Sequence, residues 1–288
     1  MCYQHPFPGV PPVDCLSPSV LLIDGPYEHV YRHSRGIRLH TAELGPNTSG
    51  APSAPPATST AATHPQHSIS EKAHIQAPLV LCLHSAYGGW FEFKDLLQPL
   101  ADAGFWAVAM DLRGYGLSDK PPVSFGYDVR GIAGDIAGMI HALGRSEAII
   151  LGSDTGAIAG RAVAAGYPSR VAGLIALDEP VCGGTQARLR SLGASLNITS
   201  LVKKREELLQ SLGLLEELEW ERTAAQVCST AAARVKMHRL VSASLPAKWR
   251  EVECPAPMVR DHQLGVGPLA HLSQPQELAR RVRKWWFT

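Results

Sequence analysis

The sequence lacks an excess of charge of either sign: 27 Lys and Arg residues are balanced by 26 Asp and Glu residues, which leaves a formal net charge of +1. A nucleic-acid-binding surface usually carries a clear basic excess, so we expect no nucleic-acid partner. Long apolar runs are also missing, and no stretch approaches the ~20 residues of a membrane-spanning helix. The first residues carry neither the basic flank nor the apolar segment of a secretory signal. We therefore expect a cytoplasmic protein without a membrane partner.

Closely spaced cysteines are missing as well. The six cysteines show none of the spacings typical of zinc sites or redox motifs; they are Cys2, Cys15, Cys82, Cys182, Cys228 and Cys254. We interpret them as buried or unused thiols and expect no metal site. What the chain does have is a hydrophobic fraction of 45% and a charged fraction of 18%. This composition predicts a globular core and excludes disorder of the whole chain.

Two segments are poor in periodic apolar residues. Residues 1–20 are rich in proline and are predicted to be flexible, and residues 46–77 consist mainly of Pro, Ser, Thr, Ala and His. Neither segment can bury enough apolar area to offset the entropy of ordering. The second segment lies between a strand-like alternation at 37–44 and a continuously apolar run at 79–83. We therefore interpret it as a disordered insertion in a loop between strands.

Short apolar strands alternate with helical patterns as far as residue 180. The expected strands are 79–83, 105–110, 148–151 and 171–177. Residues 128–143 carry an apolar stripe at helical spacing. Continuous apolar strands that alternate with helices predict the α/β class, with a mostly parallel sheet covered by helices on both faces. We assign residues 21–180 to this core.

Helical patterns dominate after residue 180. We expect a small helical cap at 181–250, and then a short strand and a last helix that complete the core at 251–288. Within the cap, the charged run Lys203-Lys204-Arg205-Glu206-Glu207 lies opposite leucines at helical spacing. We interpret this run as a solvated helix face.

A glycine-flanked aspartate follows the strand at 148–151. The segment Gly152-Ser153-Asp154-Thr155-Gly156 places Asp154 at the apex of a strand-to-helix turn, which is the form of a nucleophile elbow. The glycines are needed where a Cβ would clash with the neighbouring strand and helix. An aspartate at the apex can attack carbon and form an ester that water later hydrolyses. Asp154 is therefore the candidate nucleophile, whereas Ser153 lies one residue too early.

Two more motifs follow strands. They are His84-Ser85-Ala86-Tyr87-Gly88-Gly89 and Asp111-Leu112-Arg113-Gly114-Tyr115-Gly116-Leu117-Ser118. With the elbow, these motifs in this order resemble the α/β-hydrolase superfamily, and most closely its epoxide hydrolase and haloalkane dehalogenase branch. The resemblance covers about residues 27–45 and 78–180. It implies the α/β-hydrolase fold and a hydrolase that acts on a small, largely apolar organic substrate through a covalent Asp ester, without a cofactor.

The resemblance also implies how the site is built. The backbone amides of Ala86 and Thr155 would form the oxyanion hole, while His84 and the loop at 111–121 would be architectural. Three features depart from the family pattern. Ser85 stands where the family usually has glycine, and Thr155 stands where dehalogenases commonly have tryptophan. No tyrosine follows Tyr167, so the cap cannot supply the tyrosines with which such epoxide hydrolases donate a proton to the ring oxygen.

The general base and its orienting acid are less well defined. The family places the base on a loop before the last helix, where the usual interval falls on Pro268 and a shortened loop makes His271 the candidate. His262 is a second candidate base. For the acid, Asp261 is our first choice and Asp178, at the end of the strand 171–177, is the alternative.

Two functions remain open from the sequence. The first is a covalent hydrolase, and the second is a protein that keeps the fold and pocket but has lost turnover and acts as a binding or regulatory module. In both cases the partner would be a small molecule. The sequence leaves the substrate and the oligomeric state open.

Overall fold

The computed structural model describes residues 17–45, 77–122, 126–178, 198–227 and 256–288. Residues 1–16 of the predicted flexible segment 1–20 therefore lie outside the described residues. The last residues of this segment belong to the short 3₁₀ helix Pro18–Leu21. The predicted insertion also lies outside, apart from residue 77, as does much of the predicted cap. These domain boundaries stay predictions.

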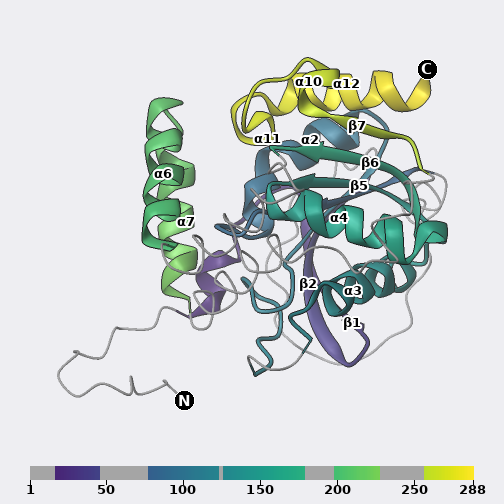
Figure 1. Ribbon diagram of the computed structural model, residues 1–288, viewed down its shortest axis with the longest axis horizontal. Helices are drawn as coiled ribbons and strands as arrows, with labels where there is room; N and C mark the ends of the chain where they lie inside the picture. Colours follow the sequence, from purple (N-terminus) through teal and green to yellow (C-terminus); the bar gives the residue numbers. More distant parts are fainter. Residues whose placement is uncertain (1–16, 46–76, 123–125, 179–197, 228–255) are drawn as a thin grey trace, which may run out of the picture.

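A mixed sheet forms the centre of the described structure (Figure 1). Its strands follow the order β1-β2-β4-β3-β5-β6-β7. They are β1 (Glu28–Ser34), β2 (Ile37–Leu44), β3 (Leu79–Leu83), β4 (Trp106–Met110), β5 (Ala148–Ser153), β6 (Val171–Leu177) and β7 (Met258–Arg260). Strand β2 pairs antiparallel with both neighbours, and the pairs from β4 to β7 are parallel. The predicted α/β class with a mostly parallel sheet is confirmed.

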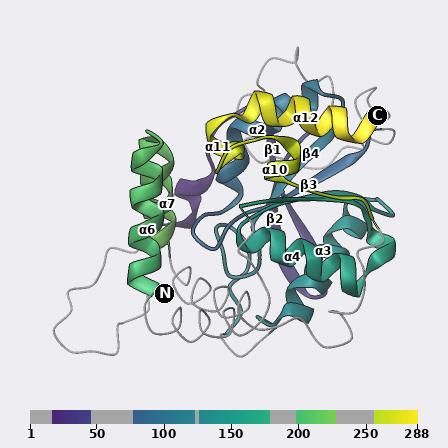
Figure 2. The same cartoon turned by 45° about the horizontal axis from the view of Figure 1, so that its top comes forward.

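Helices cover both faces of this sheet (Figure 2). They are α2 (Lys94–Asp102), α3 (Val129–Ala142), α4 (Thr155–Gly166), α10 (Asp261–Leu264), α11 (Ala270–Ser273) and α12 (Pro275–Phe287), with the 3₁₀ helices Trp90–Phe93 and Pro168–Arg170. Side chains of β3 alternate between two cores: Val80 and Cys82 pack with α2 and α12, whereas Leu81 and Leu83 pack with α3 and α4. This alternation explains the continuous apolar run at 79–83, because both faces of the strand are buried.

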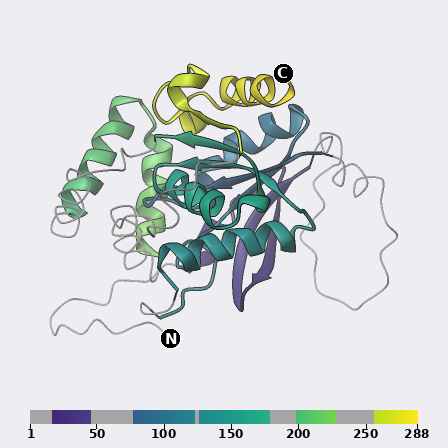
Figure 3. The ribbon, with the colours of Figure 1, turned by 45° about the vertical axis from the view of Figure 1, so that its right-hand side comes forward.

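A pair of helices, α6 (Ile198–Ser211) and α7 (Leu215–Gln226), lies beside the sheet layers (Figures 1 and 3). Buried Leu209 on α6 and Leu218 on α7 pack against Leu269 of the loop before α11. This pair lies within residues 181–250, the segment predicted to form the helical cap. Among the described residues, no helix is long and apolar enough to cross a membrane.

Candidate active site

The turn between β5 and α4 is a strained nucleophile elbow. Asp154 occupies its apex with a φ of 52° and a ψ of −113°, a conformation that costs a non-glycine residue of order 1–3 kcal/mol. A Cβ on Gly152 would lie 2.4 Å from the backbone of Gly156, and a Cβ on Gly156 would lie 2.1 Å from the carbonyl oxygen of Leu83. The two glycines therefore permit the close approach of β3, β5 and α4.

One oxygen of the Asp154 carboxylate makes no hydrogen bond with the described residues. Its Oδ2 atom is buried and without a hydrogen-bond partner among the described residues. The backbone amide donates to the carbonyl oxygen of Leu177 over 2.9 Å, which ties the apex to the end of β6. Thr155 begins α4, so the N-terminal amides of this helix lie next to the apex. The backbone of the apex is thus held in place, and Oδ2 is left without a competing hydrogen bond among the described residues.

The loop after β3 is held by a buried carboxylate. Ser85 donates its backbone N–H to Oε2 of Glu92 over 2.8 Å and its hydroxyl to Oε1 over 2.5 Å. Ala86, the candidate oxyanion residue, follows Ser85 and is fully buried. A Cβ on Gly88 would lie 2.3 Å from Oε1 of Glu92. Ser85, which stands where the family usually has glycine, therefore pairs with Glu92. The missing side chain of Gly88 leaves room for the carboxylate of Glu92.

Hydrogen bonds of His84 and Asp111 also hold the loop after β3 in place. The backbone N–H of Leu112 donates to Nε2 of His84 over 3.1 Å. Asp111 accepts the backbone N–H of Trp90 over 2.9 Å, and its other oxygen lies 2.9 Å from Nδ1 of His40. All of these hydrogen bonds are buried, and they tie the loop after β4 to the segment after β3 and to β2. They fit the architectural role expected for both residues.

The candidate base His271 lies on α11 and is fully buried. Its Nδ1 lies 4.0 Å from Oδ2 of Asp178, and its Nε2 lies 4.0 Å from Oε2 of Glu92. Neither ring nitrogen has a hydrogen-bond partner among the described residues. Burial, assisted by the charge of Arg205, lowers the pKa of His271 to about 3. The ring is therefore neutral at physiological pH and can accept a proton.

The structure places Asp178 beside His271, whereas Asp261 lies one step further out. Asp178 has a φ of 49°, and its carboxylate accepts the backbone N–H of Leu269 over 3.0 Å. Burial raises the pKa of Asp178 to about 6. Asp261 accepts the backbone N–H of Asp178 over 3.3 Å and that of His262 over 2.7 Å. Asp261 thus supports Asp178, and the side chain of His262 is 68% exposed.

Arg205 is a charged residue of the site that the sequence pattern did not reveal. The run 203–207 was expected to be solvated, yet the side chain of Arg205 is only 7% exposed, against 76% for Lys203. Arg205 donates to Oε1 of Glu221 over 2.7 Å and lies 3.9 Å from Oε1 of Glu92. The reason is helical phase: Arg205 precedes buried Leu209 by four residues and therefore shares its face.

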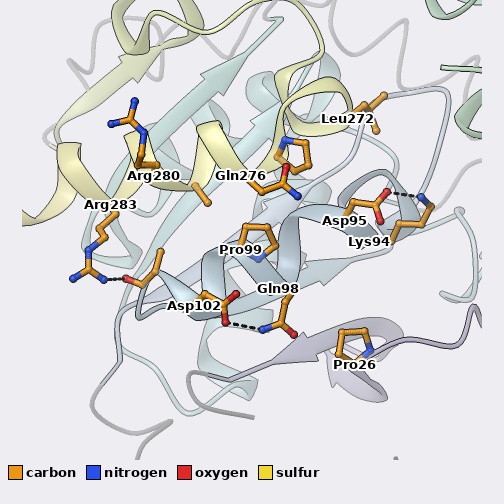
Figure 4. A pocket seen from close by; sticks show the side chains of 13 residues that line it. Pro26, Lys94, Asp95, Gln98, Pro99, Asp102, Leu272, Gln276, Arg280 and Arg283 are labelled. Carbon is orange, nitrogen blue, oxygen red and sulfur yellow. Dashed lines mark hydrogen bonds and ion pairs between the residues drawn. The ribbon is translucent and has the colours of Figure 1, made fainter. Parts of the chain in front are cut away.

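One surface pocket of the described structure does not belong to this site (Figure 4). It runs between α2 and α12, and none of the candidate catalytic residues lines it. Its charged and polar groups pair with one another, as Lys94 does with Asp95 over 2.5 Å and Gln98 with Asp102 over 2.8 Å. In the described ranges, no group of three or more His, Cys, Asp or Glu side chains is arranged to hold a metal ion.

Comparison with known proteins places these motifs in a family. Residues 78–192 match the model of the alpha/beta hydrolase fold family. Epoxide hydrolase B of Mycobacterium tuberculosis is 35% identical over 108 residues, which are 38% of this chain and 30% of that protein. The 2-(acetamidomethylene)succinate hydrolase of Mesorhizobium japonicum is 39% identical over 123 residues, 43% of each chain. The aligned part of the chain thus spans less than half the length of these relatives.

Solved structures agree over a larger part of the chain. The crystal structure of an epoxide hydrolase from Vigna radiata superimposes with a TM-score of 0.63 at 18% identity and covers 90% of this chain and 97% of that one. At such low identity the likeness concerns the fold alone. Together with the elbow at Asp154, the family match and the sequence relatives lead to one assignment. The chain has the α/β-hydrolase fold and is similar to the epoxide-hydrolase-like branch of that superfamily.

Proposed function

We propose that the protein is a hydrolase in which Asp154 attacks an electrophilic carbon of a small organic molecule. The observation that carries this proposal is the strained apex of Asp154 with its unpartnered Oδ2. Strain of this kind persists only where surrounding structure enforces it, and it is common at catalytic nucleophiles. The attack forms a covalent ester and breaks the bond between that carbon and its leaving group, which departs from a haloalkane and stays attached as the opened ring of an epoxide.

Water would hydrolyse this ester in a second step. Neutral His271 is the proposed base that takes a proton from the attacking water, and Asp178 is the proposed carboxylate that orients the ring through Nδ1. The amides of Ala86 and Thr155 would stabilise the oxyanion that forms on the ester carbonyl. Asp178 takes the role for which Asp261 was the first choice, because Asp178 lies within 4.0 Å of the ring.

The substrate class follows from the relatives and the buried surroundings. Relatives named epoxide hydrolase support an epoxide or a similar carbon electrophile. The loop after β3 that carries Ser85 and Ala86, called the oxyanion loop below, is buried at these two residues, and so is the candidate base. Such surroundings favour a small, largely apolar molecule. A charged or large substrate would not offset the cost of desolvation in such a site.

One observation favours the alternative of a binding module without turnover. A distance of 4.0 Å between His271 and Asp178 is longer than a hydrogen bond. A base that its acid does not orient would leave the ester intact. The protein would then capture a ligand once and remain alkylated.

A single-turnover experiment in water labelled with heavy oxygen tests the proposal. If Asp154 forms an ester that water cleaves at the carbonyl carbon, one labelled oxygen enters the Asp154 carboxylate and is found in the peptide that contains it. The variant Asp154→Ala should show neither label nor product, whereas Ser153→Ala should retain both. Product formation without label in Asp154 would contradict the proposal. An adduct that persists for hours would favour the binding module.

A further inference from the structure

Glu92 is a buried acid that neither the elbow nor the proposed triad uses. It lies on the 3₁₀ helix Trp90–Phe93, and its side chain is 1% exposed. Both of its carboxyl oxygens accept hydrogen bonds from Ser85, and the absence of a side chain at Gly88 leaves room for it. Burying a carboxyl group is costly, so its position next to the oxyanion loop calls for a physical reason.

The surroundings of Glu92 come from four parts of the chain. Arg205 of α6 lies 3.9 Å from Oε1 of Glu92, and Arg205 itself pairs with Glu221 of α7. His271 of α11 lies 4.0 Å from Oε2, and Ser85 approaches from the oxyanion loop. Burial raises the pKa of Glu92 to about 8, although the charge of Arg205 acts in the opposite direction. Glu92 is therefore largely protonated at neutral pH.

The ring of His271 thus faces a carboxyl group at each nitrogen. Asp178 lies near Nδ1 and Glu92 near Nε2, each at 4.0 Å. A neutral imidazole has one N–H and one lone pair, so it can satisfy one ionised carboxylate and one carboxylic acid. With two ionised carboxylates, the lone pair would face a negative charge in a buried site. The array of Asp178, His271 and Glu92 is therefore favourable when it holds one more proton than the ring alone, on Nε2 or on Glu92.

We propose that Glu92 is a positioning residue that exchanges a proton with Nε2 of His271, so that it supplies the proton used in the first half-reaction and takes back the proton released in the second. The inference rests on the proposed function and deepens it. The gap of 4.0 Å closes to a hydrogen-bond distance with a shift of about 1 Å. The exchange acts through His271, since Glu92 itself is enclosed by the loop, α6 and α11.

The proton balance favours an epoxide over a haloalkane. When Asp154 opens an epoxide, one C–O bond breaks, the ester bond forms, and the ring oxygen takes the proton that Glu92 passes to Nε2 of His271. When water cleaves the ester, the products are the diol, the free carboxylate of Asp154 and one proton, which returns through Nε2 to Glu92. A haloalkane consumes no proton in its first step. The stored proton would supply what cap tyrosines donate in relatives, and this sequence has no tyrosine after Tyr167.

The variant Glu92→Gln isolates proton exchange from packing. Glutamine can still accept the N–H of Ser85 and donate to its hydroxyl, but it cannot exchange a proton. With a haloalkane probe, whose first step consumes no proton, Glu92 stays protonated and Glu92→Gln should form and hydrolyse the Asp154 ester at the wild-type rates. With styrene oxide as the probe, both steps should slow ~10²-fold. Glu217→Gln is the matched control, because Glu217 is also buried but pairs with Lys94 over 2.9 Å, away from His271; its rates should match wild type.

A second measurement uses the unaltered protein. In NMR of histidine labelled on its ring nitrogens, the Nε2 signal of His271 should shift with an apparent pKa near 8, and the signal is assigned by its loss in His271→Gln. If this titration is absent, or if wild type and Glu92→Gln hydrolyse the ester formed from styrene oxide at equal rates, the role of Glu92 is overturned while the proposed function stands. Absence of any Asp154 ester in wild type would overturn the proposed function and, with it, this inference.

Discussion

Oδ2 of Asp178 lies 4.0 Å from Nδ1 of His271, although Asp178 ends β6 and His271 belongs to a short helix near the end of the chain. Leu269 brings them together. It has a left-handed conformation with a φ of 50°, and its backbone N–H donates to both oxygens of Asp178, over 3.0 Å and 3.1 Å. This reversal turns the shortened loop so that His271 points inward.

Asp178→Asn should slow hydrolysis of the Asp154 ester ~10²-fold or more, because the neutral amide cannot stabilise the protonated ring. Asp261→Asn should slow it less than tenfold, since Asp261 contacts the backbone of Asp178. In wild type the hydrolysis rate should rise with pH through about 6 and then level off, because burial raises the pKa of Asp178 to about 6 and its ionised form is required. Stopped-flow measurement of the second half-reaction between pH 5 and pH 7.5 would check this. A larger loss in Asp261→Asn would return the role to Asp261.

His271→Gln should convert turnover into a single burst. With a haloalkane, ester formation needs only the carboxylate of Asp154, whereas hydrolysis needs a base, so one equivalent of halide should appear and then stop. Mass spectrometry of the intact protein should show the adduct persisting. His262→Gln is the control and should behave as wild type, because the side chain of His262 is 68% exposed. A burst in both variants, or in neither, would mean that the base has been located wrongly.

Gly156→Ala should abolish ester formation by displacing the elbow. The new methyl group would lie 2.1 Å from the carbonyl oxygen of Leu83, so α4 must move away from β3 at a cost of roughly 1–3 kcal/mol. Gly144→Ala is the comparison, because its Cβ would meet nothing within 4 Å, although its φ of +72° also strains the backbone. Both variants should lose stability in urea unfolding, but only Gly156→Ala should lose reactivity. Retained ester formation in Gly156→Ala would contradict a rigid elbow.

Asp111→Asn should destabilise the fold by roughly 2 kcal/mol at pH 7. Burial alone would raise the pKa of Asp111, but the hydrogen bond and charge of His40, with other donors, lower it to about 2. A depressed pKa contributes stability above about pH 4, and this contribution is lost as the pH falls towards 2. The difference between wild type and variant should therefore shrink over this range in urea titrations. Glu207→Gln, on an exposed ion pair with Lys203, should change stability by less than ~0.5 kcal/mol. A constant difference would contradict the assignment.

The sequence by itself determined the fold class and the position of the elbow with Asp154 at its apex. Both are encoded locally: the apolar run at 79–83 needs two buried faces, and the spacing of Gly152, Asp154 and Gly156 defines a strand-to-helix turn whichever fold surrounds it. Backbone sterics act between neighbours in the chain. The elbow could therefore be predicted without knowing what packs against it.

Only the tertiary structure decided which groups surround the candidate base. Asp178 and Asp261 are equivalent as sequence signals, and the choice depends on which carboxylate Leu269 and α11 bring to the ring. Glu92 and Arg205 gave no motif at all, because their importance comes from burial against each other and His271. Distances between remote segments and the desolvation of charged groups set these roles and their pKa values, and neither quantity is a property of the local sequence.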